Sequence, residues 1–371
     1  MARVVFVVNS LAGGGAERAV VNILAQSRAM TDRHDIHLVL LDRETEAYAP
    51  PDFVTVHRLD CAGSLIRSIR MLGVTLKALK PAVVVSALSR ANVANVVNGA
   101  VQRYRTILCE HNYTSGKHKG LSGRIAKLLV RIFYPRADAV IGVSQGIRED
   151  LIAHYGVRRE RVTAVANPID VDNIRRNGQA PLGLDIAQPY LLGMGRFASH
   201  KNFALLIEAF AQSRFTGSLL LLGQGPEQER LAALAAQLGV ADRLAMPGFL
   251  SNPFPAVRQA SAYILPSNGE GLPTAIIEAL VLGTPVISTN CRTGPSEILD
   301  DQVDMQVSGV VDAKFGVLVP TEDVAAMALA IDQLTDPTRL ADMQSRAASG
   351  AARYSFDGPV AEYWRRIEAF V

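Results

Sequence analysis

Two glutamates, eight residues apart, lie in and just after a glycine-containing segment of the second half of the chain. Residues 266–274 read Pro-Ser-Asn-Gly-Glu-Gly-Leu-Pro-Thr, between a short apolar run and an apolar helical pattern. Free backbone N–H groups at such a helix start suit a diphosphate. Glu278 can accept hydrogen bonds from ribose hydroxyls, and Glu270 lies where a sugar ring would extend. Alternatively, both are solvated acids favoured by the helix dipole. The residues expected to bind such a ligand are Glu270, Gly271, Leu272, Pro273, Thr274 and Glu278.

A second loop before a helix carries two cations. Residues 193–202 read Gly-Met-Gly-Arg-Phe-Ala-Ser-His-Lys-Asn and precede an amphipathic helical pattern. A diphosphate leaving group gains negative charge as its bond to a sugar breaks. Fixed cations at Arg196 and Lys201 would therefore stabilise the transition state more than the ground state, in place of a metal ion. The alternative is a pair of surface bases near a helix start.

The first half offers a glycine run and a histidine. Gly13, Gly14 and Gly15 open a helix after the first apolar run, but Arg18 occupies the third glycine position of the dinucleotide fingerprint. A ligand could approach Gly14 and Gly15 closely, although a tight turn also explains part of the run. His111 follows another β-branched run and could donate to a sugar hydroxyl, and a structural histidine is the alternative.

No residue pattern predicts a metal site. Asp170-Val171-Asp172 matches the Asp-x-Asp pattern with which some enzymes hold a metal–diphosphate, but it begins a connection and does not end a hydrophobic strand. The cysteines at positions 61, 109 and 291 are odd in number and lack a Cys-x-x-Cys pairing, which argues against a disulfide framework and a zinc site. We therefore expect neither a metal nor a cofactor.

Parallel sheets are the elements expected to position these residues. Short β-branched runs alternate with helical stretches in two series, separated by a polar, Gly- and Pro-containing connection at 168–188. With 371 residues, of which 49% are hydrophobic and 20% charged, the chain is predicted to form an α/β protein of two doubly wound, Rossmann-like domains facing each other across a cleft. The predicted strands are 4–8, 37–41, 83–86, 106–109, 139–143, 190–193, 219–222, 263–266 and 286–289. The predicted domains are residues 1–168 and 189–350, with a helix at 351–371 that packs back on the first domain.

Positive charge is concentrated in the first half. The net charge is +3, but residues 1–170 hold 23 Lys and Arg against 14 Asp and Glu, which suggests an anionic partner. The stretch 115–137 interleaves bases with Leu, Ile and Phe, so it can lie on an anionic bilayer, and a core helix with a solvated basic face is the alternative. Nucleic acid would leave the second-half residues unexplained, so it is not expected. We expect a cytoplasmic protein, peripheral at the inner face of the membrane, that contacts membrane or acceptor through Lys117, Lys119, Arg124, Lys127 and Arg131.

In their order along the chain, these pieces resemble the family 4 retaining glycosyltransferases of the GT-B fold. The matching segments span nearly the whole sequence: Gly13–Glu17, His111, Asn167–Asp170, Gly195-Arg196 with Lys201-Asn202, Gly223–Pro226, and Glu270 with Glu278. Their joint occurrence is specific, although no single segment is.

The resemblance implies roles for the residues. The first domain would bind the acceptor and the second the donor. The catalytic set would be Glu270 at the transferred sugar, His111 near its far hydroxyls, and Arg196 and Lys201 on the diphosphate, with Glu278 on the ribose and Phe249 near the base. The family is thought to use front-face attack with the leaving phosphate as base, so Glu270 is not assigned as a nucleophile.

The resemblance also implies a substrate class. Thr289–Leu299 is similar to members that extend lipid-linked bacterial oligosaccharides. The implied reaction moves a hexose or N-acetylhexosamine from a nucleotide-diphosphate sugar, UDP-sugar before GDP-mannose, to a glycan or polyprenyl-diphosphate-linked acceptor in cell-surface polysaccharide biosynthesis. Two alternatives stay open: a GT-B nucleotide-sugar epimerase or hydrolase, and a non-catalytic nucleotide-sugar-binding protein that could dispense with Glu270.

Overall fold

The computed structural model describes residues 1–117 and 120–371, and the chain forms two compact units. One unit comprises Met1–Ile169 and Ser355–Val371, and the other comprises Asp170–Tyr354. Each unit contains a seven-stranded sheet with its own buried core. The predicted pair of doubly wound α/β domains is therefore confirmed.

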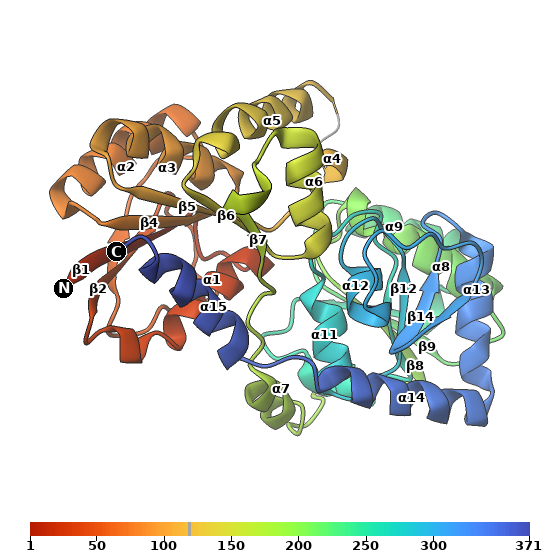
Figure 1. The fold of residues 1–371 in the computed structure, drawn as a ribbon. Helices are drawn as coiled ribbons and strands as arrows, with labels where there is room; N and C mark the ends of the chain where they lie inside the picture. Colours follow the sequence, from red (N-terminus) through yellow and green to blue (C-terminus); the bar gives the residue numbers. More distant parts are fainter. Residues whose placement is uncertain (118–119) are drawn as a thin grey trace. The chain divides into compact units, whose positions relative to one another are not determined.

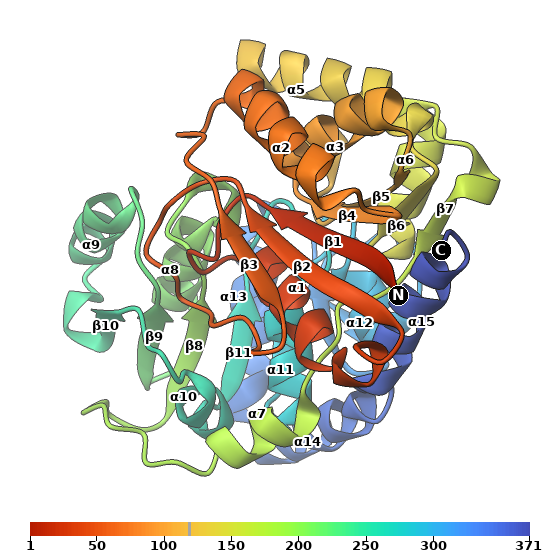
Figure 2. The same cartoon turned by 90° about the vertical axis from the view of Figure 1, so that its left-hand side faces the viewer.

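The sheet of the N-terminal unit is parallel throughout, in the order β3-β2-β1-β4-β5-β6-β7. Alternate residues of the central strand β1 enter two cores, because strand side chains point to opposite faces of a sheet. Val4, Phe6 and Val8 join one cluster, and Val5 and Val7 join the other. Figure 2 shows α2 and α3 on one face of this sheet and α1 on the other. The strands are β1 Ala2–Val8, β2 His34–Leu40, β3 Thr55–Arg58, β4 Val83–Ala87, β5 Arg105–Glu110, β6 Ala139–Gly142 and β7 Val162–Ala164, and the α-helices are α1 Gly15–Ala25, α2 Leu65–Leu79, α3 Ser89–Gln102, α4 Thr114–Lys117, α5 Gly120–Phe133 and α6 Gln145–Tyr155.

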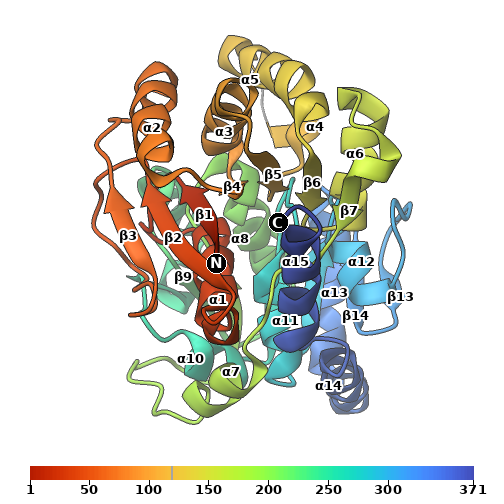
Figure 3. The same ribbon diagram turned by 60° about the vertical axis from the view of Figure 1, so that its left-hand side comes forward.

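The last helix, α15 (Asp357–Glu368), belongs to this N-terminal unit. It lies beside α1, as Figure 3 shows, and contributes Tyr363, Trp364 and Ile367 to the same apolar cluster. The Trp364 indole N–H donates to the Ser27 hydroxyl over 2.8 Å, and its ring stacks on His34 at 5.5 Å between centroids. The end of the chain therefore completes the core of the first unit.

The sheet of the C-terminal unit has the order β10-β9-β8-β11-β12-β14-β13, and only the β13–β14 pair is antiparallel. Helices α8, α9 and α13 share one apolar cluster with strands of this sheet. The strands are β8 Tyr190–Met194, β9 Ser218–Leu222, β10 Leu244–Gly248, β11 Ala262–Leu265, β12 Val286–Thr289, β13 Val311–Ala313 and β14 Gly316–Val319, and the α-helices are α7 Val171–Asn177, α8 Phe203–Gln212, α9 Gln228–Gln237, α10 Phe254–Gln259, α11 Thr274–Val281, α12 Pro295–Asp300, α13 Val324–Asp332 and α14 Pro337–Ala351.

All nine predicted strands are present, with ends within three residues of the prediction. The sequence reading missed β3, β7, β10, β13 and β14. No helix among the described residues is long and apolar enough to cross a membrane. The topology places the carboxyl ends of the parallel strands in each unit along one edge of its sheet, where ligands bind in doubly wound folds.

Candidate functional site

Lys201 and Glu270 form an ion pair at the carboxyl edge of the C-terminal sheet. The Lys201 amine donates to Glu270 Oε1 over 2.7 Å, and the two side chains are 21% and 11% exposed. Lys201 ends the short 3-10 turn Ser199–Lys201 (η4) after β8, and Glu270 lies in the loop after β11. The structure thus joins one predicted cation to the predicted sugar-contacting carboxylate, 69 residues apart.

One backbone and one side-chain hydrogen bond hold the two loops of this pair together. The Asn268 amide N–H donates to the His200 carbonyl over 2.8 Å. The Asn202 side-chain amide donates to Asn268 Oδ1 over 3.2 Å, and Asn202 itself adopts a left-handed conformation with φ of 50°. The two loops that carry the ion pair are therefore also joined by hydrogen bonds that do not involve Lys201 or Glu270.

Arg196, the other predicted cation, is exposed and makes no side-chain hydrogen bond or ion pair with the part of the chain that the structure describes. It follows Gly195 directly after β8. The loops after β8 and β9 are closely packed here, because a Cβ atom built on Gly223 would lie 1.9 Å from the Gly195 carbonyl oxygen. Arg196 thus extends from a rigid turn with its charge uncompensated.

Helix α11 supplies the N-terminal end expected near a diphosphate. It begins at Thr274 after Pro273, and its first turn leaves backbone N–H groups without intrahelical partners. Glu278 lies one turn further on and is 2% exposed. Burial raises the pKa of the Tyr263 phenol well above its usual value, and the nearby charges of Glu270 and Glu278 raise it further. The two predicted glutamates therefore flank one buried phenol, and Glu278 is not the solvated acid of the alternative reading.

The loop within Thr289–Leu299, in which the sequence analysis placed no site residue, braces the glutamate loop. The Thr293 hydroxyl donates to the Glu270 carbonyl. Gly294 has φ of +96°, and a Cβ there would lie 2.4 Å from Pro273 Cδ. Burial, followed by the charge of Glu270, raises the pKa of the neighbouring Cys291 thiol. The dipeptide Gly294-Pro295 was the available signal, since such dipeptides mark turns.

Phe249, predicted near the base, follows the last residue of β10 and is 65% exposed. Its strand is tied to the neighbouring loop by the Gly223 N–H, which donates to the Gly248 carbonyl over 2.9 Å. The ring thus stands free at the same edge of the sheet as the loops after β8 and β9.

The glycine run of the N-terminal unit has two different environments. Gly14 is the N-cap of α1, and a Cβ built on it would lie 2.0 Å from Oε2 of Glu17. A Cβ on Gly15 would meet nothing within 4 Å. Glu17 therefore covers Gly14, and Gly15 is the more accessible of the two predicted contact points.

His111 follows β5 in the N-terminal unit. Both imidazole nitrogens are buried, and neither has a hydrogen-bond partner among the described residues. Burial lowers the pKa of His111 to about 4, so the ring is neutral at pH 7 and retains one N–H donor. The neutral ring keeps a donor, but both nitrogens are covered in this structure, so donation to a hydroxyl stays a prediction.

A buried polar network, not foreseen from the sequence, precedes His111. Glu110 is fully buried, and it accepts from the Tyr134 hydroxyl over 2.5 Å and from the Asn112 backbone N–H over 2.9 Å. The Asn92 side chain in turn donates to the Tyr134 hydroxyl over 2.8 Å. The network fixes both residues that flank His111.

The basic stretch 115–137 forms α4, α5 and the turn Tyr134–Arg136 (η2). Arg124 and Arg131 are exposed on α5, but the Lys127 amine donates to the Ser115 carbonyl over 2.6 Å. This bond ties the Lys127 amine to the backbone but leaves its charge unpaired among the described residues, and its predicted contact with membrane or acceptor stays a prediction. Lys119 lies outside the described residues, and the side chain of Lys117 is likewise not described.

No cluster of three or more His, Cys, Asp or Glu side chains that could hold a metal ion occurs within residues 1–117 and 120–371. The Asp170 carboxylate accepts from the Asn173 backbone N–H over 2.9 Å, so it caps α7. The Asp-x-Asp pattern is thus accounted for by a helix start.

Two family models match the chain, and the boundary between their matches lies close to the boundary between the two structural units. Residues 13–173 match the model of glycosyltransferase family 4, and residues 175–350 match the model of glycosyl transferases group 1. The two matches together take in most of both units.

Two curated relatives are sugar transferases. N-acetylgalactosamine-N,N'-diacetylbacillosaminyl-diphospho-undecaprenol 4-alpha-N-acetylgalactosaminyltransferase of Campylobacter jejuni is 24% identical over 361 residues, which cover 94% of each chain. Lipopolysaccharide 1,6-galactosyltransferase of Escherichia coli is 30% identical over 173 residues, which cover 45% of this chain and 47% of that one. Among solved structures, Anabaena HepE in complex with UDP and glucose has a TM-score of 0.77, 20% identity and full coverage of both chains.

Proposed function

Because the chain belongs to the family 4 glycosyltransferases of the GT-B fold, we propose that it transfers a hexose or N-acetylhexosamine from a nucleotide-diphosphate sugar to a glycan or polyprenyl-diphosphate-linked acceptor. The observation that carries the proposal is the Lys201–Glu270 ion pair beside the start of α11. It joins a cation for a diphosphate to a carboxylate for a sugar.

The two cations differ in how far their charge is balanced. Lys201 is balanced by Glu270, whereas Arg196 has no partner among the described side chains. Arg196 therefore supplies net positive charge for the diphosphate. Arg196 and Lys201 both meet the charge that develops on the leaving phosphate, and Glu270 holds Lys201 in place for it. Glu278 binds the ribose from α11.

The retaining outcome is part of the proposal. Glu270 is paired with Lys201 at 2.7 Å. A paired carboxylate is better suited to positioning the sugar and the lysine than to attacking the sugar as a nucleophile. The leaving phosphate then serves as the base for the acceptor hydroxyl. The role of His111 at the sugar rests on the family resemblance alone, since both of its nitrogens are buried within the N-terminal unit.

The donor preference rests on the relatives. The Anabaena structure contains UDP and glucose, and the Campylobacter enzyme is named for transfer of N-acetylgalactosamine to a diphospho-undecaprenol acceptor. We therefore place UDP-hexose and UDP-N-acetylhexosamine before GDP-mannose. Cell-surface polysaccharide biosynthesis, with the protein peripheral at the inner face of the cytoplasmic membrane, is the setting that these acceptors suggest.

The test incubates purified protein with each nucleotide sugar, with and without a polyprenyl-diphosphate-linked oligosaccharide. Acceptor-dependent release of the nucleoside diphosphate and an axial, donor-like linkage by proton NMR are expected. Equal release without any acceptor would favour a hydrolase, conversion of the nucleotide sugar into an isomer without release would favour an epimerase, and binding without turnover would favour a sensor. Lys201→Met should abolish transfer. Lys314→Met is its matched control, because Lys314 makes an ion pair with Asp301 in the same unit, outside the candidate site.

A further inference from the structure

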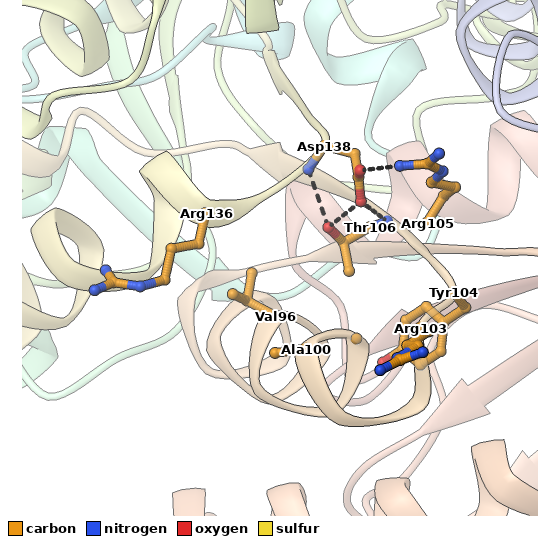
Figure 4. A pocket seen from close by; sticks show the side chains of 9 residues that line it. Val96, Ala100, Arg103, Tyr104, Arg105, Thr106, Arg136 and Asp138 are labelled. Carbon is orange, nitrogen blue, oxygen red and sulfur yellow. Dashed lines mark hydrogen bonds and ion pairs between the residues drawn. The ribbon is translucent and has the colours of Figure 1, made fainter.

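Two polar clusters of the N-terminal unit lie away from His111. The first borders a cavity of about 390 Å³ at the amino ends of β5 and β6, where Asp138 accepts from Arg105 over 2.9 Å and from the Thr106 N–H over 2.8 Å (Figure 4). Burial raises the pKa of Asp138, but these hydrogen bonds lower it overall, so its charge is constant near neutral pH. The second cluster contains two histidines, and histidine is the side chain that titrates in that range.

The second cluster joins two neighbouring strands through His37 and His57 (the histidine pair). The Nδ1 atom of His37 on β2 lies 3.0 Å from the Nε2 atom of His57 on β3, and the ring centroids are 5.2 Å apart. His37 is 7% exposed, and His57 is half-buried. At this distance, one of the two facing nitrogens donates an N–H and the other accepts it. The contact therefore helps to hold β3, which is the edge strand of its sheet, to β2.

One carboxylate and one arginine face the histidine pair. Asp35 Oδ2 lies 3.0 Å from His37 Nε2, and it accepts from Arg3 Nε over 2.8 Å. Arg3 also donates to the Leu79 carbonyl at the end of α2, which packs against this face of the sheet. The other charged residues on these elements are exposed: Arg67, Arg70 and Lys77 of α2 and Arg58 of β3. His37 thus has a carboxylate beside it, whereas His57 has no ion-pair partner among the described residues.

Protonation of both rings breaks this contact. While at least one ring is neutral, one facing nitrogen has a lone pair that can accept the N–H of the other. When both rings are protonated, both facing nitrogens carry N–H groups, which repel each other. Burial lowers the pKa of His57, and the charge of His37 lowers it further. Because a free histidine has a pKa of about 6.5, the separated pair binds more protons below that pH than the contacting pair, and separation becomes more favourable as pH falls.

Strand β3 also holds the loop that joins it to β2 (the β2–β3 loop). Arg58, the last residue of β3, donates to the two carboxylate oxygens of Glu46 over 2.7 and 3.1 Å. The next residue of the loop, Ala47, donates its N–H to the Leu11 carbonyl over 2.8 Å. The Cβ atom of Ala47 lies 3.5 Å from a Cβ built on Gly13. The loop therefore lies against the glycine run, and its position depends on β3.

We propose that the histidine pair is an acid-sensitive contact, which fastens β3 to β2 while at most one ring is protonated and releases β3 together with the β2–β3 loop when both rings are protonated. Release moves the loop away from Gly13 and so uncovers the glycine run. All the residues involved belong to the N-terminal unit. The inference does not rest on the proposed function, because no step of it involves a donor, an acceptor or their reaction.

The experiment measures hydrogen–deuterium exchange in the full-length protein, corrected for the intrinsic effect of pH on exchange. Two amides report on the release: Leu59, whose N–H donates to the Leu40 carbonyl over 2.8 Å directly after β3, and Ala47 in the β2–β3 loop. Exchange at such edge positions reports local opening. Between about pH 7.5 and about pH 5.5, protection of both amides should fall ~10-fold, because opening takes up one additional proton over this range.

Single substitutions within the histidine pair test the cause of this loss. In His57→Gln and in His37→Gln, only one titratable ring remains, so protection should no longer depend on pH. The matched control His154→Gln changes an exposed histidine of α6 in the same unit and should keep the wild-type loss. Wild-type protection that is constant with pH, or an undiminished loss in both substituted pairs, would overturn the inference. Loss at Leu59 without loss at Ala47 would reject release of the loop.

Discussion

At the scale of single residues, the candidate donor site is defined by which charges are balanced. Lys201 and Glu270 neutralise each other at 2.7 Å, Arg196 is uncompensated among the described residues, and Glu278 is buried in the second turn of α11. Arg196 and Lys201 are thus placed to meet charge that develops during the reaction, whereas Glu278 is placed to bind a part of the donor that does not change. Kinetics can therefore tell them apart.

Replacing the cations should lower kcat. We expect Arg196→Ala and Lys201→Met to reduce kcat at saturating donor by ~100-fold or more, because they face charge that grows on the leaving phosphate. Glu278→Gln should mainly raise the donor KM, by a factor equivalent to ~1–3 kcal/mol for a damaged charge-assisted hydrogen bond. Lys314→Met provides the control for folding. Wild-type kcat in both cation variants would overturn the division of roles.

Chelation should leave activity unchanged if the two cations replace a metal ion. We expect transfer to persist in excess EDTA, since no metal-ligating cluster is present among the described side chains. The measurement is the initial rate with and without EDTA, followed by addition of magnesium or manganese. Loss of activity that either metal restores would reject the cation assignment, even though Asp170 caps a helix.

His111 should make unfolding sensitive to acid. Its pKa is lowered to about 4 by burial, against about 6.5 in an unfolded chain, so the unfolded state binds the extra proton between these values. The free energy of unfolding is therefore unaffected by this group above about pH 6.5. It falls by on the order of 3 kcal/mol as the pH decreases from about 6.5 to about 4. His111→Gln should therefore flatten urea-derived unfolding free energy across this range. A slope identical to that of the wild type would show that the histidine titrates normally.

The sequence singled out individual residues but not the contacts between them. It predicted Lys201 and Glu270 as site residues, because each follows a strand and precedes a helix. It did not predict their direct ion pair, since sequence patterns report local structure and not which loops meet. Thr293 and Gly294 were missed for the same reason: they act on the neighbouring loop through one hydrogen bond and one close backbone approach.

At the scale of elements, strands with a buried apolar pattern were predictable and the others were not. Strand β3 exposes Thr55 and Arg58, and β10 is only partly buried, so neither gives a clear period. Strands β7 and β13 have three residues each. By contrast, β14 is fully buried and apolar and could have been recognised from Gly316–Val319.

Helix α5 presents apolar and basic side chains to solvent together. Ile125 and Leu128 are 52% and 55% exposed, and Arg124 and Arg131 lie on the same exposed stripe. Helix α2 repeats this pattern with Ile66 and Val74 among bases. Exposed apolar residues beside cations are typical of helices that rest on an anionic bilayer.

Removing charge from α5 should weaken membrane binding. We expect Arg124→Gln/Arg131→Gln to reduce co-sedimentation with phosphatidylglycerol vesicles at low salt, and salt to release the wild type as screening increases. Arg175→Gln/Arg176→Gln is the charge-matched control. Lys127→Gln should affect vesicle binding less, because its amine is engaged with the Ser115 carbonyl. Unchanged sedimentation of the α5 double variant would remove this helix from the membrane hypothesis.

At the scale of the whole molecule, the chain builds two cores and closes the first with its last helix. The single tryptophan of the sequence, Trp364, lies on α15 in the core of the N-terminal unit, whereas the Lys201–Glu270 pair belongs to the C-terminal unit. Tryptophan fluorescence therefore reports on one unit, and far-ultraviolet circular dichroism reports on both. This arrangement allows ligand-linked stability to be assigned to a unit.

If the C-terminal unit holds most of the donor, UDP should stabilise the two signals unequally. At a UDP concentration ~100 times its dissociation constant, linkage adds ~2.7 kcal/mol to the unit that binds it. We expect the dichroism transition in urea to broaden and its later part to move to higher denaturant, while the Trp364 fluorescence transition shifts little. Lys201→Met should abolish the shift, and Lys314→Met should preserve it. Equal displacement of both signals by UDP would mean that the donor stabilises both units alike, and the assignment of donor binding mainly to residues 170–354 would then be wrong.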